Sequence, residues 1–197
     1  MQATTTAAPS SHSTTAPAWR VSRWFNTPHP LKLAGLRGRV VVLHTFQMLC
    51  PACVSHGLPQ ASLTRSLFDE RDVCVIGLHT VFEHHAVMNA AALETFILEY
   101  RLAFPIGIDA AAAGDAVPLT MRAYGLRGTP SVVVFDRQGA VRLSHFGHLD
   151  DMALGGVIGQ LIAELPNVAG SIQRTAEQKA TLDPAGAGCN DDACARA

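Results

Sequence analysis

Two cysteines three positions apart, Cys50 and Cys53, are the residues of this chain best suited to redox chemistry. They follow an apolar, β-branched run at 40–43, which is typical of a buried strand, and Pro51 suits the first turn of a helix. A cysteine at a helix start meets unpaired backbone N–H groups and the positive end of the helix dipole, which favour the thiolate. We therefore predict that Cys50 attacks a disulfide and that Cys53, one turn later, resolves the mixed disulfide.

The same spacing also allows two other roles, a purely structural pair and a metal site. A four-cysteine zinc site needs a second pair, and the tail cysteines Cys189 and Cys194 are the nearest equivalent. Those two can instead serve as auxiliary thiols, through a reversible disulfide or a relay to Cys50. We favour redox chemistry at Cys50 and Cys53, and we predict neither a bound metal nor a cofactor.

A proline, Pro130, stands immediately before a second apolar run. Because proline cannot donate to the hydrogen-bond ladder of a sheet, this position suits an edge, a turn or a cis peptide bond placed against the site. Thr129 before it and Pro51 between the cysteines are candidate substrate contacts. His79 ends the apolar run 72–80, beside the strand that leads to Cys50, and is a further candidate for the substrate groove.

Composition sets the broad class of the protein. The chain has 197 residues, 48% of them hydrophobic, which suffices for one well-packed core. A net charge of −1 gives no sign of a nucleic-acid or acidic-lipid surface, and no apolar stretch is long enough to span a membrane. The N-terminus has neither the basic nor the apolar region of a secretory signal, so we expect a cytoplasmic protein, with a periplasmic one as the alternative if a signal has been removed before residue 1.

Three regions differ in composition. Residues 1–18 are rich in Thr, Ala, Ser and Pro and predict a disordered leader, whereas residues 166–197 predict a flexible tail. Between them, residues 19–165 alternate strand and helix patterns, which predicts an α/β sandwich around a mixed sheet. We expect strands at 38–47, 72–80 and 104–109 and two within 130–147, and helices at 51–69, 89–102, 118–125 and 150–165.

Several segments together resemble the thioredoxin superfamily, and within it the TlpA-like and DipZ-like redoxins. The resemblance covers residues 19–165 and rests on CPAC at 50–53, on GTPSVVVFDRQGAV at 128–141, and on VIGLHTVFEHH, YRLAFPIGID and HFGHLDD. It implies a thioredoxin-like fold in which Pro130 is cis and faces the pair, with Cys50 attacking and Cys53 resolving. It also implies that residues 81–117 form the helix–strand insertion that distinguishes these redoxins from minimal thioredoxins.

Two departures from the family pattern concern the site. Pro59 lies six residues after Cys53, where five is usual, and the extra residue predicts a π-bulge or a shifted helix start. His44 stands six residues before Cys50, where thioredoxins bury an acid that exchanges a proton with the second thiol. A desolvated, neutral imidazole is suited to the same relay, and a passive core histidine is the alternative.

These residues favour a thiol–disulfide oxidoreductase whose partners are protein or small-molecule disulfides or dithiols and a separate thiol reductant; nucleic acid is not expected as a partner. A peroxiredoxin-like thiol peroxidase is the first alternative, because Arg127 echoes that family's arginine. Gln47 and Leu43, however, stand where its threonine and proline are usual. A Cys/His metal-binding protein is the second alternative, since nine histidines permit it.

Overall fold

The computed structural model describes residues 16–164 of the chain. The tail expected at 166–197, with Cys189 and Cys194, lies outside the described residues, as does most of the leader expected at 1–18. The three proposed regions therefore stay predictions. Within residues 16–164, no helix is long and apolar enough to cross a membrane.

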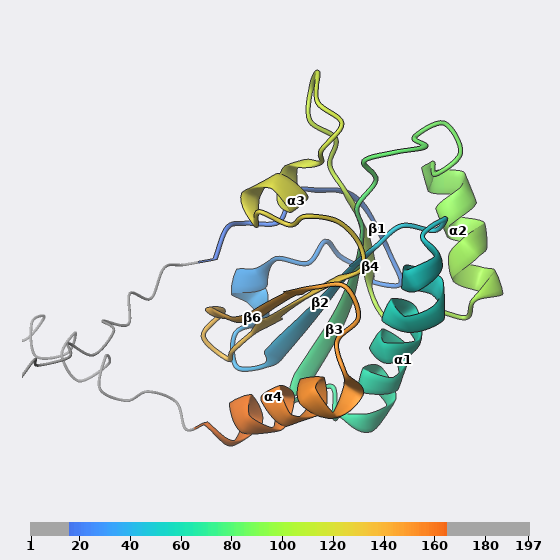
Figure 1. Cartoon of the computed structure of the whole chain (residues 1–197). Coiled ribbons are helices and arrows are strands. Elements are labelled where there is room, and N and C mark those ends of the chain that lie inside the picture. The colour runs from blue at the N-terminus through green and yellow to red at the C-terminus, as the bar shows by residue number, and fades with distance from the viewer. Residues whose placement is uncertain (1–15, 165–197) are drawn as a thin grey trace, which may run out of the picture. The chain divides into compact units, whose positions relative to one another are not determined.

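Strands and helices alternate along the described part of the chain, as the sequence pattern predicts (Figure 1). The strands are β1 (Val21–Phe25), β2 (Val40–Phe46), β3 (Val73–His79), β4 (Ile106–Asp109), β5 (Ser131–Phe135) and β6 (Val141–Phe146). The α-helices are α1 (Leu58–Leu67), α2 (Ala90–Glu99), α3 (Leu119–Ala123) and α4 (Asp151–Ala163). A 3-10 helix covers Leu33–Leu36, and a π-helix covers Cys53–Gly57 directly before α1.

The six strands form one mixed sheet in the order β1-β4-β3-β2-β5-β6. Strands β2, β3 and β4 run parallel, whereas β5 is antiparallel to β2, β6 to β5 and β1 to β4. All seven residues of β2 are buried, which explains why its sequence is apolar on both faces. The expected α/β fold with a mixed central sheet is confirmed.

Helices α1, α2 and α4 pack on one face of the sheet, and shorter segments cover the other face (Figure 1). The helical face holds Val42 and Phe46 of β2, Leu58 and Ala61 of α1, Leu93 and Ile97 of α2, and Leu154 and Ile158 of α4. The opposite face holds Val41, Leu43, Ile76, Leu78, Val133 and Phe135, against Trp19, Leu33, Leu36, Tyr124 and Leu126. The central strands are thus packed against apolar side chains on both faces of the sheet.

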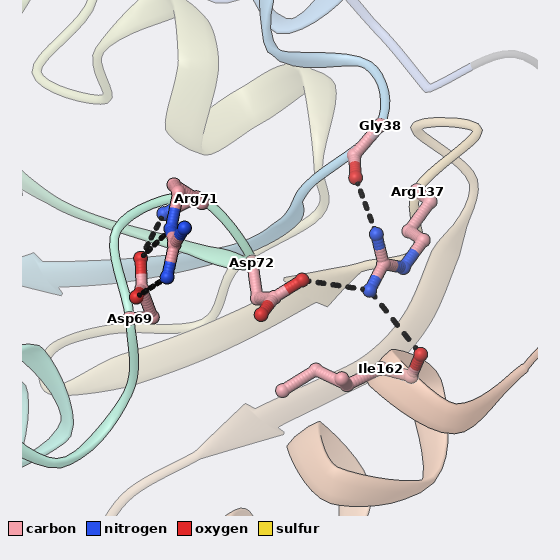
Figure 2. Close-up of polar contacts among 6 residues, drawn as sticks. All are labelled: Gly38, Asp69, Arg71, Asp72, Arg137 and Ile162. Atoms are coloured by element: carbon pink, nitrogen blue, oxygen red, sulfur yellow. Dashed lines mark hydrogen bonds and ion pairs between the residues drawn. The ribbon is translucent and has the colours of Figure 1, made fainter.

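Arg137, in the turn between β5 and β6, ties several chain segments together at one end of the sheet (Figure 2). Its guanidinium donates to the carbonyl oxygens of Gly38 (2.8 Å) and Ile162 (3.2 Å) and pairs with the Asp72 carboxylate at 2.9 Å. Gly38 and Asp72 precede β2 and β3, and Ile162 lies in the last turn of α4. The contacts therefore brace the end of the sheet opposite the cysteine pair, which follows the carboxyl end of β2.

The expected insertion at 81–117 contains helix α2 and strand β4, and β4 pairs with β3 on one side. On its other side lies β1, within residues 19–37, to which the sequence pattern assigns no element. Gly107 of β4 permits this pairing, because a Cβ there would lie 2.8 Å from the Val21 side chain. The insertion thus adds β4 to the sheet next to β3, and β1 pairs with the other edge of β4.

Candidate redox site

The two cysteines lie where the central strand β2 gives way to a helix. Residues 47–49 leave the end of β2, Cys50 precedes the first helical turn, and Cys53 begins the π-helix. Cys53 is fully buried in the core beside Leu58 and Ala61, whereas Cys50 is half-buried and its neighbour Pro51 is exposed. Of the two thiols, Cys50 is therefore the one that a partner can reach.

Both thiols are free, and their sulfur atoms lie 2.6 Å apart. The Cys53 thiol donates to Cys50 Sγ, and the Cys53 backbone N–H donates to the same sulfur at 3.2 Å. Cys50 Sγ also lies 3.6 Å from the carbonyl oxygen of Thr129. The start of the helix thus supplies a backbone hydrogen-bond donor to Cys50 Sγ.

The helix after the cysteines contains the irregularity that Pro59 predicts. Residues Cys53–Gly57 form a π-turn before α1 begins at Leu58, which accommodates the extra residue before Pro59. The Thr129–Pro130 peptide bond is cis, also as expected. A Cβ at position 57 would lie 3.1 Å from Pro130 Cβ, so Gly57 lets the π-turn pack closely against the proline.

Burial governs the acidity of Cys53. Desolvation, and then the hydrogen bond and charge of Cys50, raise the pKa of the Cys53 thiol well above its ordinary value. A backbone hydrogen bond of Gln47 and a hydrogen bond from the Thr129 side chain act in the opposite direction. Cys53 is consequently a thiol in the resting site, and its deprotonation during resolution needs help from its surroundings.

His44 lies on the helical face of the sheet, between Val42 and Phe46 on the same side of β2. It is 2% exposed, and desolvation lowers its pKa to about 4, so the ring is neutral at pH 7 as expected. Neither ring nitrogen has a hydrogen-bond partner among the described residues, so no hydrogen bond joins His44 to Cys53. The structure places the ring in the core that surrounds Cys53.

His79 does not lie at an open groove, where the sequence suggests it. Its side chain is fully buried, with its ring 5.3 Å from that of Phe46, which stacks in turn on Phe96 of α2. Burial lowers the pKa of His79 to about 4. In this conformation the imidazole offers no surface to a substrate, because β3 directs it into the same sheet face as Phe46.

Gln47 is a site residue that sequence reasoning did not propose. It is 1% exposed, directly after β2, and its amide nitrogen lies 3.5 Å from Thr129 Oγ1 and 3.3 Å from a Glu83 carboxylate oxygen. Its backbone carbonyl accepts from the Cys50 N–H at 3.2 Å. A glutamine between a buried strand and the cysteine pair is the signal that could have identified it, because a buried amide needs hydrogen-bond partners.

The arginine of the peroxidase alternative contacts an aromatic ring, and two histidines of the metal-binding alternative are exposed. The guanidinium of Arg127 stacks over the Phe146 ring, 5.2 Å from its centre. His84 and His85 are exposed in the loop after β3. Within residues 16–164, no three His, Cys, Asp or Glu side chains are grouped so as to hold a metal ion.

Comparison with known proteins identifies the family. The model of the Redoxin family matches residues 12–152. Among solved structures, the thioredoxin-like superfamily protein SPOA0173 is 47% identical, with a TM-score of 0.75, over 77% of this chain and 97% of that chain. A thiol-disulfide isomerase from Corynebacterium glutamicum is also 47% identical, with a TM-score of 0.73, over 76% of this chain and 98% of that chain.

More distant structures share the fold alone. StoA from Bacillus subtilis is 19% identical, with a TM-score of 0.54, over 73% of this chain and 97% of that chain. No curated protein matches the chain significantly. Since the family match spans most of the sequence and the fold is thioredoxin-like, the chain belongs to the Redoxin family, within the thioredoxin superfamily.

Proposed function

We propose that this protein is a thiol–disulfide oxidoreductase in which Cys50 attacks a disulfide and Cys53 resolves the mixed disulfide. The observation that carries this proposal is the geometry of the pair: two free thiols with sulfurs 2.6 Å apart, one half-buried and one fully buried, beside a cis-proline. The chemistry named for the isomerase from Corynebacterium glutamicum supports it, because that chain is 47% identical over 76% of this one.

The reaction proceeds in two exchanges. The Cys50 thiolate attacks one sulfur of the substrate disulfide, a Cys50–substrate disulfide forms, and the other substrate sulfur leaves as a thiolate that takes up a proton. Cys53 then loses its proton and attacks Cys50 Sγ, which releases the second substrate thiol and forms the Cys50–Cys53 disulfide. Two electrons pass from the protein dithiol to the substrate, and an external dithiol restores the pair.

Catalysed reduction of a protein disulfide tests this function. With dithiothreitol as reductant, the reduced protein should accelerate the cleavage of the insulin interchain disulfides, followed as turbidity. Alkylation of Cys50 with iodoacetamide should remove the acceleration. A protein that leaves the dithiothreitol rate unchanged, although its cysteines are shown to be reduced, would contradict the proposal.

Peroxide should be a poor substrate by comparison. Gln47 and Leu43 replace the residues that polarise peroxide in peroxiredoxins, and Arg127 is stacked on Phe146. We therefore expect hydrogen peroxide to oxidise Cys50 no faster than it oxidises thiols outside dedicated peroxidases. Stopped-flow tryptophan fluorescence measures this rate, and a value in the range of dedicated peroxidases would favour the peroxidase function instead.

We propose the proton relay of His44 as a contribution to the resolving step. Replacing His44 by alanine should slow release of the mixed disulfide by up to about 10²-fold and leave the first attack by Cys50 nearly unchanged. Because the pKa of His44 is lowered to about 4, the ring is already neutral at about pH 5, and the slowing should be constant from about pH 5 to pH 9.

Single-turnover release measured across that pH range provides the test. Val42→Ala, which opens a cavity on the same side of the same strand, is the matched control and should release at the wild-type rate. If His44→Ala also releases at the wild-type rate, His44 is a core histidine without a catalytic role.

The remaining expectations from the sequence stay predictions. These are the protein or small-molecule partners, the separate thiol reductant, the auxiliary role of Cys189 and Cys194, and the cytoplasmic location. Pro51 and Thr129 stay candidate substrate contacts: Pro51 is exposed beside Cys50, and the carbonyl of Thr129 faces Cys50 Sγ.

A further inference from the structure

Two exposed histidines, His56 and His148, lie in contact near the redox site. Their ring centres are 4.8 Å apart, and the ring planes are tilted by 53°. His56 lies in the π-turn that begins at Cys53, and His148 lies in the segment between β6 and α4. The contact therefore joins two segments that are distant in the sequence.

Each histidine stands next to a glycine that contacts Pro130. Gly57 follows His56, and a Cβ on this glycine would lie 3.1 Å from Pro130 Cβ. Gly147 precedes His148, and its backbone N–H donates to the Pro130 carbonyl at 2.8 Å. Because one proline contacts both neighbours, the backbones of the two histidines are held side by side.

Gln60 of α1 ties the same two segments together a second time. Its amide nitrogen donates to the Leu149 carbonyl and to the Asp151 carboxylate at 2.7 Å each. His145 Nε2 lies 3.1 Å from the carbonyl oxygen of His148. These contacts order the backbone around the two rings before any ligand binds, which lowers the entropic cost of binding one.

The spacing of the two rings matches that of histidines bound to one metal ion. With Zn–N bonds of about 2.0–2.1 Å, each ring centre lies about 3.2 Å from the ion, and two rings at a tetrahedral angle have centres about 5 Å apart. The observed separation is 4.8 Å. Within residues 16–164, no hydrogen bond occupies a ring nitrogen of His56 or His148, so each neutral ring has a lone pair for a ligand.

The two segments carry negative rather than positive charge. Asp150 and Asp151 follow His148 closely, and no lysine or arginine occurs within residues 51–64 or 143–164. Neither segment therefore places a positive charge beside a cation at the histidine pair, and the two carboxylates attract one.

We propose that His56 and His148 form a binding site for Zn²⁺ or a similar divalent ion that prefers imidazole nitrogen. Each ring supplies one nitrogen, and water completes the coordination, because no third His, Cys, Asp or Glu of the described residues is grouped with them to hold a metal ion. With only two protein ligands, the ion exchanges with solvent rather than stabilising the fold. The site is separate from the two thiols and does not depend on disulfide exchange.

A zinc titration of the thiol-blocked protein tests the site. The full chain is oxidised and its remaining reachable thiols are blocked with N-ethylmaleimide, so that cysteine sulfur does not bind the ion. NMR signals of the histidine ring protons, assigned from those missing in His56→Gln and in His148→Gln, are then followed as zinc chloride is added. We expect the signals of both histidines to shift together, before those of other histidines, with one apparent dissociation constant.

The single variants show whether the two histidines bind the same ion. In His56→Gln, the zinc affinity of the site should fall by at least about 10-fold, since even the loss of an outer-shell partner has an effect of that size. The His148 signal should then no longer shift in the wild-type range of zinc, and His148→Gln should act in the same way on the His56 signal. Both side chains are exposed, so we expect wild-type folding, which circular dichroism checks.

The double variant His84→Gln/His85→Gln is the matched control, because these two histidines are adjacent and exposed in the loop after β3. It should leave the shifts and the affinity at His56 and His148 unchanged. The proposal is overturned if zinc does not shift the His56 and His148 signals, or shifts them only together with those of other histidines. A His148 signal that responds in His56→Gln as it does in wild type would also overturn it.

Discussion

A Cys50→Ser variant should lose all catalysed disulfide exchange, whereas Cys53→Ser should accumulate a stable mixed disulfide with its substrate. The difference follows from where the two sulfurs lie. Cys50 is half-buried and its sulfur accepts the backbone N–H of Cys53 at 3.2 Å, so a substrate can reach this sulfur at the start of the helix. Cys53 is fully buried and reaches only the neighbouring sulfur.

The chemistry explains why the two variants should behave differently. Serine at position 50 cannot form the first mixed disulfide, so exchange should fall to the uncatalysed rate. Serine at position 53 leaves the first attack intact but removes the thiol that releases the substrate, and the intermediate persists. Cys74, which is partly buried and whose pKa is raised by burial, should not substitute for either residue.

Mass spectrometry of the products after reaction with a disulfide-bonded protein distinguishes the two outcomes. The Cys53→Ser protein should carry the substrate covalently at Cys50, and a reducing agent should release it. Cys74→Ser is the matched control and should turn over without a trapped complex. If Cys50→Ser and Cys53→Ser trap substrate equally well, the assignment of attacking and resolving thiols is wrong.

The folded protein should lose stability as the pH falls from about 6.5 towards 4, because protonating two buried histidines places positive charge in the desolvated core. Burial lowers the pKa of His44 and of His79 from 6.5 to about 4. In that interval the unfolded chain binds more protons than the folded one, so protonation favours unfolding. For each histidine, the free energy of unfolding should be about 3 kcal/mol lower at pH 4 than above about pH 6.5.

Urea unfolding over this pH interval measures the effect. A double variant with leucine at both positions should show a much flatter dependence of the free energy of unfolding on pH. His85→Leu, at an exposed loop position, is the control and should retain the wild-type dependence. A double variant as acid-sensitive as wild type would show that other groups, such as the Asp69 and Glu164 carboxylates, whose pKa values are lowered by Arg71 and Arg142, govern the acid response.

Local sequence rules predicted most of the core elements. The continuous apolar run of β2 indicated a buried central strand, and all seven of its residues are buried. The helix expected at 89–102 is present as α2, where the Asn89 side chain accepts from the N–H groups of Ala91 and Ala92. The extra residue before Pro59, relative to the family pattern, indicated a π-bulge or a shifted helix start, and a π-turn precedes α1. Each of these features depends on neighbours close in the chain.

Strand β1 was not predicted, because its formation depends on a distant partner. It has five residues with irregular burial, so its sequence lacks the alternation that marks a half-buried strand. Its pairing with β4 places Val21 opposite Asp109 and Phe25 opposite Ile106. The pairing requires a residue without a side chain at position 107, because a Cβ there would lie 2.8 Å from the Val21 side chain. Nothing near β1 in the sequence indicates this contact.

The site shows the same division between local and distant information. The order of strand, cysteine pair and helix led to the choice of Cys50 and Cys53 as candidates, and the resemblance to the redoxins implied the cis bond that precedes Pro130. The directions of His79 and Gln47 were not predictable, because both depend on how side chains pack after the sheet has formed. His79 points into the core, whereas Gln47 points towards Thr129.

A redox titration of the reduced protein tests most directly whether Cys50 and Cys53 form a working redox pair. Equilibration in glutathione and dithiothreitol buffers, followed by alkylation and peptide mapping, gives the fraction of disulfide at each potential. We predict one two-electron transition, with a Cys50–Cys53 disulfide as its product and a midpoint between roughly −270 mV, as in thioredoxin, and roughly −120 mV, as in a strong oxidase. A pair that stays reduced throughout that range, or that forms its disulfides with other cysteines, would contradict the account.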